Sequence, residues 1–501
     1  MSKFRATLLT LFSAVVNTLL LTVFYLIYNK LIITHYGSHI NGLISTLTQF
    51  VSMFTILEGG FSLAAVVASY EPIIKRNYEK LNNILYTTKK FLARIVLLYV
   101  AVTLLFGSIY VNFINSPIGL FRTYLLLLVT VGTTALSLGI LPQYTIVLSG
   151  HNKLYIVTLV SVLSRLLTWC VSIVLILRYS NIVLVYSINF ANILLNIFML
   201  RLYEKRHFPY VSYKGKYEPI SGTRDIMFQK ITATIFTSTD LVLISVGINL
   251  AVASVYNVYN QIFQAVYVYL SSASNAPGDS FGQLLKTGNK VKASELFHIY
   301  QKIVQLFSTI FLTTAGITII PFLRIYTNNV HDTNYIVPSL AILLYTYFYL
   351  KLNNVPFGLI INLAGLFKLQ NMQCAVAAVV NLVSSVVLMH SIGIQGVVLG
   401  SVLGTAVITV VNIFKVHSVV DYLDTERLLF FLSCNYCIGL LMILISIRFW
   451  KSISNSYIQW FFVSAILFAC IATLTIIINY ILDKQTVCQS IKYFRTRILK
   501  K

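Results

Sequence analysis

A few ionisable side chains interrupt the long apolar runs of this sequence, and they are the residues most able to do chemistry. The cations are Lys30, Arg165 and Lys351, and the carboxylates are Glu58, Asp240 and Asp279. A charge in a membrane-spanning helix costs about 2.5–3.5 kcal/mol on insertion scales, so it usually faces a protein interior or a water-filled cavity. Such cations can bind an anionic ligand, and such carboxylates can carry a proton or pair with a cation.

The composition places these residues in a membrane protein. The chain has 501 residues, of which 57% are apolar and only 10% charged, and its mean hydropathy is +0.82. A spanning helix needs about 20 apolar residues, and the sequence predicts an all-α polytopic membrane protein with about 14 transmembrane helices. The predicted spans are 8–34, 40–68, 92–113, 119–147, 152–178, 181–200, 226–247, 250–283, 296–323, 336–366, 370–390, 393–414, 428–448 and 458–482.

The distribution of positive charge predicts the topology. With the N-terminus inside, only Arg122, Arg178, Arg324, Arg448 and Lys451 fall on the outside, and most other Lys and Arg residues lie in or beside inside segments. This is the positive-inside pattern, which predicts an even number of crossings with both termini cytoplasmic. The net charge of +23 is therefore a topology signal and an attraction to anionic membrane lipids, and we expect no nucleic-acid partner.

Catalysis is not indicated by the sequence. The histidines are dispersed without metal-ligand spacing, and no Walker-type loop is present. No predicted outer loop is long enough for a catalytic domain with convergent nucleophile and acid–base groups. We therefore expect a protein that is not an enzyme and has no cofactor, with coupling to H⁺ or Na⁺ left open.

Weak sequence matches recur in the same order in the two halves of the chain. Gly37, Pro142, Gly150-x-x-Lys153 and Asn196-Ile197-Phe198 correspond to Gly247, Pro356, Gly365-x-x-Lys368 and Asn412-Ile413-Phe414. This indicates two six-helix repeats, of the kind that rock about a central site in transporters. The predicted organisation is an N-terminal bundle (1–200), a basic cytoplasmic connector (201–225), a C-terminal bundle (226–420), an additional helix pair (421–482) and a basic cytoplasmic tail (483–501).

The repeat also superposes Lys30 on Asp240, near the outer ends of two corresponding helices. Opposite charges at symmetry-related positions predict an ion pair that latches the outer mouth, although each residue could instead have a local partner. Asp279 and Glu58 are further candidates for gating or ion coupling. For Glu58, a structural bond to a neighbouring helix is the favoured alternative.

Several short motifs give the chain a resemblance to a known family. Tyr36-Gly37, Asn41-Gly42-Leu43, Glu58-x-Gly60, Tyr70-x-Pro72 and Asn77-Tyr78-Glu79-Lys80 resemble the Wzx-type polysaccharide flippases of bacterial capsule and O-antigen loci. Thr239-Asp240, Val255-Tyr256-x-x-Tyr259, Gly365-x-Phe367-Lys368, Asn381 and Gly393-Ile394-x-Gly396-Val397 resemble their second half. The resemblance spans most of 1–420 and implies the fold of the multidrug/oligosaccharidyl-lipid/polysaccharide exporter superfamily, in the bacterial cytoplasmic membrane.

Two departures from the family pattern bear on the site. Lys30 stands where the family suggests arginine, which keeps the charge but loses bidentate phosphate recognition. The acidic residue expected before Asn381 is absent from 375–380, which weakens the case for a coupling-ion site in this half.

The resemblance implies a polyprenyl-pyrophosphate-linked oligosaccharide as substrate, flipped from inside to outside for surface polysaccharide synthesis, with a polymerase and glycosyltransferases as further partners. A cavity between two bundles would shelter the headgroup, and fixed cations would offset its diphosphate charge. We expect Arg165, Lys351 and Lys30 to be those cations, with Arg165 first because it lies near mid-membrane. For each of the three cations the alternative is a structural ion pair, for example with Glu58 or Asp279, and for the two lysines it is also snorkelling to an interface.

Three other functions stay open at this point. Twelve helices and acidic pockets would favour a drug/cation antiporter of the same superfamily, whereas fourteen helices and basic pockets do not. A large outer loop with paired acidic or arginine residues would favour a membrane-embedded glycan polymerase or ligase, and the sequence predicts none. A non-transporting scaffold for a synthesis complex is supported only by the basic inner surface.

Overall fold

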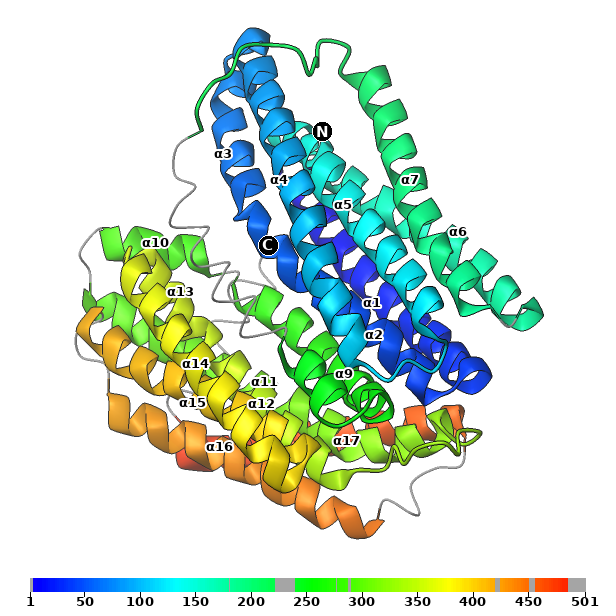
Figure 1. Ribbon diagram of the computed structural model, residues 1–501. Coiled ribbons are helices and arrows are strands. Elements are labelled where there is room, and N and C mark those ends of the chain that lie inside the picture. Colours follow the sequence, from blue (N-terminus) through cyan, green and yellow to red (C-terminus); the bar gives the residue numbers. More distant parts are fainter. Residues whose placement is uncertain are drawn as a thin grey trace. The chain divides into compact units, whose positions relative to one another are not determined.

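The chain is almost entirely helical. The computed structural model describes residues 3–179, 181–220, 239–275, 277–286, 290–419, 424–449 and 456–484, and within these residues it contains helices and no strand. Figure 1 shows the chain as two compact units, Met1–Ser254 and Val255–Lys501. The predicted all-α polytopic membrane fold is confirmed, since ten helices of the described residues are long and apolar enough to span a membrane.

Long helices form the first unit. They are α1 (Lys3–Tyr36), α2 (Ser38–Met53), the 3₁₀ turn η1 (Phe54–Glu58), α3 (Phe61–Ile74), α4 (Tyr78–Phe113), α5 (Leu120–Gly150), α6 (Leu154–Arg178) and α7 (Ile182–His207). Residues 239–247 add a further helical segment. An apolar core joins α2, α4 and α5, and another joins α1 to α6. These faces are buried against one another, while apolar side chains on the outside of α4, α5 and α6 are exposed, as expected for a surface in contact with lipid.

The second unit starts within α9 (Leu250–Ser274). It continues with α10 (Gly278–Lys286), α11 (Lys290–Tyr326), α12 (Pro338–Asn353), α13 (Val355–Leu363), α14 (Phe367–Ile392), α15 (Ile394–Val419), α16 (Thr425–Ser446), the 3₁₀ turn η2 (Ile447–Phe449) and α17 (Tyr457–Leu482). Helix α11 is the most buried of the candidate spans and packs against α12, α16 and α17. Helices α14 and α15 pack along each other, as α6 and α7 do in the first unit.

Three predicted spans are not continuous helices. The span predicted at 40–68 breaks at Gly59 and Gly60, whose φ angles of 59° and 74° are left-handed and end η1 before α3 begins. The span predicted at 336–366 divides into α12 and α13 at Asn354, and the one predicted at 250–283 divides into α9 and α10. Proline explains part of this, because Pro356 favours the first turn of a new helix and lacks the N–H that a continuing helix needs.

Two other segments also differ from the prediction. The residues between the predicted spans 40–68 and 92–113 are also helical: α3 continues to Ile74, and most of the remainder is the first part of the 36-residue helix α4. The span predicted at 226–247 and the tail predicted at 483–501 lie largely outside the described residues.

The described part of the predicted 201–225 connector is held against α4 after α7 ends. The side chain of Asn82 accepts from the N–H of Ser212 at 2.8 Å and donates to the carbonyl of Tyr210. Asn83 accepts from the N–H of Lys216 at 2.8 Å. These bonds supply partners for backbone groups that lie outside regular structure.

Candidate substrate-binding and gating residues

Arg165 lies on α6, and its side chain is exposed. Its guanidinium carbon lies 6.0 Å from the ring centroid of Trp169, one helical turn away. Within the described parts of the chain, no carboxylate lies within ion-pair distance of Arg165. The ion pair with Glu58 that we considered as a structural role is therefore not seen among these residues, and the one with Asp279 stays a prediction because the Asp279 side chain lies outside them.

An aromatic contact connects α6 to α1. Trp169 stacks against Phe24 and Tyr28, with ring centroids 6.0 and 6.4 Å apart. Lys30 follows Tyr28 on α1 and is half-buried. The first unit thus places Arg165 and Lys30 on two helices that pack directly against each other.

Lys351 lies on α12 of the second unit, among aromatic rings. Its ammonium is 4.5 Å from the ring centroid of Tyr267, 5.1 Å from that of Tyr347 and 5.2 Å from that of Phe348. Rings around an ammonium stabilise it through their negatively charged faces. Tyr267 comes from α9, so this environment joins residues that are far apart in the sequence.

Glu58 lies at the break between η1 and α3. Its carboxylate accepts from the N–H of Ser62 at 2.8 Å and from that of Gly60 at 3.2 Å, so it caps the N-terminus of α3. The side chain is 5% exposed and lines a mostly apolar cavity of about 400 Å³ between α3 and α5, beside Pro142. This geometry gives Glu58 a structural role and also access to a cavity.

The other two carboxylates lie in different settings. Asp240 belongs to the helical residues 239–247 and is 7% exposed. The same segment contacts α4, where the hydroxyls of Tyr110 and Ser245 are 2.7 Å apart. Asp279 belongs to α10, and its side chain lies outside the described residues. The proposed latch between Lys30 and Asp240 stays a prediction.

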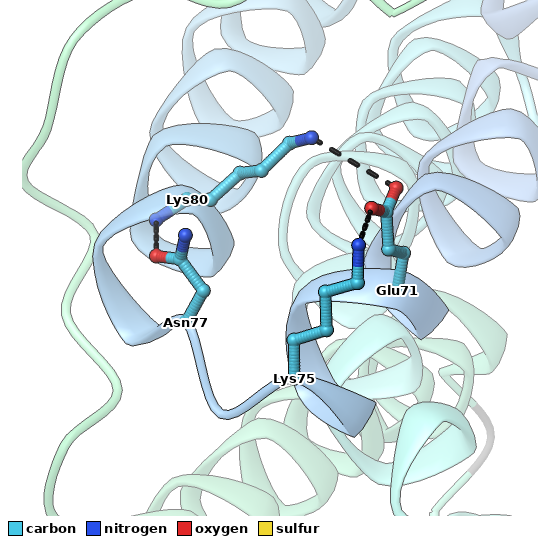
Figure 2. Close-up of polar contacts among 4 residues, drawn as sticks. All are labelled: Glu71, Lys75, Asn77 and Lys80. Atoms are coloured by element: carbon cyan, nitrogen blue, oxygen red, sulfur yellow. Dashed lines mark hydrogen bonds and ion pairs between the residues drawn. The ribbon is translucent and has the colours of Figure 1, made fainter.

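Part of the family-like motif at 70–80 is explained by local structure. The side chain of Asn77 accepts from the N–H of Lys80 at 3.0 Å and caps α4. Figure 2 shows the turn that follows α3, where Lys75 and Lys80 both point at the carboxylate of Glu71, at 2.7 and 3.9 Å. These residues fix a helix–helix turn rather than a cavity.

One group of charged residues was missed by the sequence analysis. Lys302, Arg427 and Asp483 line a polar cavity of about 320 Å³ in the second unit. Lys302 lies about two turns inside the predicted span 296–323. Its seven-residue spacing from Glu295, which places the two side chains on the same helix face, was the signal in the sequence that could have indicated this group. The other two residues come from α16 and from the end of α17, and no local pattern joins them to α11.

Comparison with known proteins shows that the fold of this chain is similar to that of several solved structures. No family profile matches the chain, and no curated protein matches it in sequence. A solved structure titled lipid II flippase MurJ, inward closed conformation, has a TM-score of 0.69 at 12% identity, covering 95% of this chain and 99% of that one. An inward-facing multidrug resistance MATE transporter of the MOP superfamily has a TM-score of 0.63 at 13% identity, covering 79% and 95%.

A third similar structure is the eukaryotic MATE transporter AtDTX14, with a TM-score of 0.57 at 16% identity, covering 88% of this chain and 99% of that one. At such low identities the likeness concerns the fold. Together with the apolar helices, it shows that this chain is a multipass membrane protein with the fold seen in these flippase and MATE transporter structures.

Proposed function

We propose that this protein is a flippase that moves a polyprenyl-pyrophosphate-linked oligosaccharide across the bacterial cytoplasmic membrane by alternating access. The observation that carries the proposal is the combination of a fold like that of a flippase with Arg165 inside the candidate span Leu154–Arg178. Arg165 has no carboxylate partner among the described residues. An arginine can donate two parallel hydrogen bonds to a phosphate.

Each cation has a role in this proposal. Arg165 binds the pyrophosphate, and the packing of Trp169 on α1 holds its helix in place. Lys30 lies on the helix packed against α6 and adds positive charge. Lys351 is half-buried and partly shielded from water by the rings around it, which makes its charge more effective towards an anion. Glu58, Asp240 and Asp279 serve gating or H⁺ or Na⁺ coupling.

The experiment measures where the lipid-linked oligosaccharide accumulates. In cells that lack the protein, we expect this intermediate to build up on the inner leaflet and surface polysaccharide to be lost. Arg165→Ala should cut export at least about tenfold, because a charge-assisted hydrogen bond contributes about 1.5–3 kcal/mol. Arg165→Lys should restore part of the activity.

A matched control uses the same helix. Arg178→Ala removes the same charge from the last turn of α6, at the predicted outer end, and should leave export unchanged. Protein level is measured for each variant by immunoblot of membranes. Normal export by Arg165→Ala at a normal protein level would remove Arg165 from the site.

A drug/cation antiporter is the second candidate, favoured by the likeness to MATE structures. Expression in a strain without its own drug exporters distinguishes the two. An antiporter would raise resistance to cationic drugs, whereas the flippase that we propose would leave resistance unchanged and restore surface polysaccharide to a flippase-deficient strain.

A further inference from the structure

The polar cavity of the second unit lies where α11 and α16 begin and α17 ends. The sequence predicts that this end faces the cytoplasm. Its volume of about 320 Å³ is near the lower limit for small-ligand pockets, so it fits a headgroup rather than a large glycan. Residues of α11 and α16 line it together with Asp483, which directly follows α17, and four of the lining residues carry formal charge.

Two cations converge on one aromatic ring in this cavity. The ammonium of Lys302 lies 3.5 Å from the ring centroid of Phe431, and the guanidinium carbon of Arg427 lies 5.9 Å from it. Arg427 donates to Asp483 at 2.9 Å. Lys302 is 3% exposed, and its ammonium has no hydrogen-bond acceptor among the described residues. A buried ammonium without an acceptor is costly, and an anionic oxygen would relieve this cost.

The charges are also ordered by depth. Glu295, His298 and Lys302 follow one another at helical spacing on α11 and all line the cavity. Glu295 is exposed at the mouth, whereas Lys302 is buried. Seven residues of α-helix separate them by roughly 10 Å along the axis. The cavity therefore has an acidic residue, Glu295, at its mouth and a basic residue, Lys302, in its interior.

We propose that this cavity binds the headgroup of a zwitterionic phospholipid of the phosphatidylethanolamine type, from the inner leaflet. The phosphate accepts from Lys302 and Arg427, and the primary ammonium pairs with Glu295. In the inner leaflet the phosphate lies deeper than the ammonium, which is the order of the charges on α11. A purely anionic headgroup would place no positive group beside Glu295, so the pocket selects against it. Binding there would stabilise the packing of α11, α16 and α17, because a ligand that binds only the folded protein raises its stability.

The test uses the purified, delipidated full-length protein in detergent, so it is independent of any transport assay. Native mass spectrometry and thermal shift measure binding of dioleoyl-phosphatidylethanolamine, dioleoyl-phosphatidylglycerol and free phosphoethanolamine. We expect the ethanolamine lipid to bind about two- to fivefold tighter than the glycerol lipid, because an exposed charge pair contributes only modestly to affinity. Free phosphoethanolamine should bind far more weakly than the lipid.

Two variants separate the two charged groups. Lys302→Met keeps most of the length of the side chain without its charge, and it should weaken binding of the ethanolamine lipid at least about tenfold, since it removes a buried charge partner. Glu295→Gln changes an exposed residue, so folding should be unaffected, and it should abolish the preference over the glycerol lipid. Lys368→Met, an exposed position on α14, is the matched charge control and should bind like the unaltered protein.

Three results would overturn the proposal. They are equal affinity of the unaltered protein for both lipids, a Glu295→Gln variant that keeps the preference, and equal affinity for free phosphoethanolamine and the lipid. If Lys302→Met does not fold, the exposed Glu295→Gln variant still decides between these outcomes.

Discussion

Glu58 illustrates how a single residue can be assigned either to packing or to transport. Its carboxylate caps α3 through two backbone N–H groups, and it also lines a cavity. The two roles need different chemistry. A cap needs only an acceptor oxygen, which an amide also supplies, whereas proton coupling needs a group that titrates.

The matched pair Glu58→Gln and Glu58→Ala separates these roles. We expect Glu58→Gln to keep most export, because its amide oxygen can still accept from Ser62. Glu58→Ala should lower the free energy of unfolding by about 1 kcal/mol, the usual cost of a lost cap. Export assays and thermal unfolding in detergent measure both. Complete loss of export in a stable Glu58→Gln protein would contradict the capping role and favour proton coupling.

Gly42 is a second residue whose role is set by one contact. A Cβ atom at this position would lie 1.7 Å from the carbonyl oxygen of Leu250, the first residue of α9. Beside it, Asn41 donates to the hydroxyl of Ser254 at 2.7 Å. The backbone of α2 therefore approaches α9 as closely as only glycine permits, which gives a physical reason for Asn41-Gly42 in the family-like motif.

Gly42→Ala should destabilise the protein by at least about 3 kcal/mol, the upper part of the usual range for overpacking, because the obstacle is backbone rather than a flexible side chain. Gly358→Ala is the control, since its Cβ would meet only the side chain of Gln370, at 3.8 Å. Melting temperatures in detergent should fall for the first variant and stay constant or rise for the second. Equal melting temperatures would show that α2 and α9 do not approach in this way.

At the scale of elements, the spans were predictable and their breaks were not. Apolar runs longer than about 20 residues are expected to cross lipid as helices, because a helix makes all its backbone hydrogen bonds within its own segment. The same residue types, however, act differently in different places. Pro142 lies inside the uninterrupted helix α5, whereas Pro356 follows a break between α12 and α13. Paired glycines could have served close helix packing, but both Gly59 and Gly60 are left-handed and end an element.

The candidate site shows the same division. The contact between Arg165 and Trp169 follows from a four-residue spacing and could be read from the sequence. Around Lys351, Tyr347 and Phe348 lie within one turn on the same helix, whereas Tyr267 comes from α9. Around Phe431, Arg427 is one turn away on α16, whereas Lys302 comes from α11. Only tertiary packing brings Tyr267 to Lys351 and Lys302 to Phe431, so no local pattern could have indicated these two contacts.

The turn between α3 and α4 allows a prediction about pH. The hydrogen bond from Lys75 lowers the pKa of Glu71 below its ordinary value of 4.5, and the same bond raises the pKa of Lys75 above 10.5. The stabilising effect of Glu71 is therefore present above pH 4.5 and lost as pH falls through its lowered pKa. That of Lys75 is present below pH 10.5 and lost as pH rises through its raised pKa.

Both side chains are exposed, so we expect Lys75→Met to change stability too little to detect at pH 7. Asn77→Ala removes the cap of α4 and should cost about 1 kcal/mol at both pH 4 and pH 7, because this bond does not titrate. Thermal unfolding at the two pH values measures the difference. A larger loss for Lys75→Met than for Asn77→Ala would contradict this ranking.

For the whole molecule, the positive-inside pattern predicts a topology that can be tested at the two ends of α4. Its 36 residues extend over about 54 Å, well beyond the roughly 30 Å of a hydrocarbon core. Its two ends should therefore emerge on opposite sides of the membrane. Glu79, in the first turn, is exposed near the basic residues of the α3–α4 turn, and Asn115, just after the last turn, is also exposed.

In a cysteine-free variant, Asn115→Cys should react with a membrane-impermeant maleimide in intact cells, because the loop that follows α4 is predicted to lie outside. Glu79→Cys should react only after the membrane is permeabilised. The two positions lie at opposite ends of one helix and have similar exposure, so each is the control for the other. The reverse pattern would invert the topology and place the cavity around Lys302 on the outer side, where the inner-leaflet lipid that we propose could not reach it.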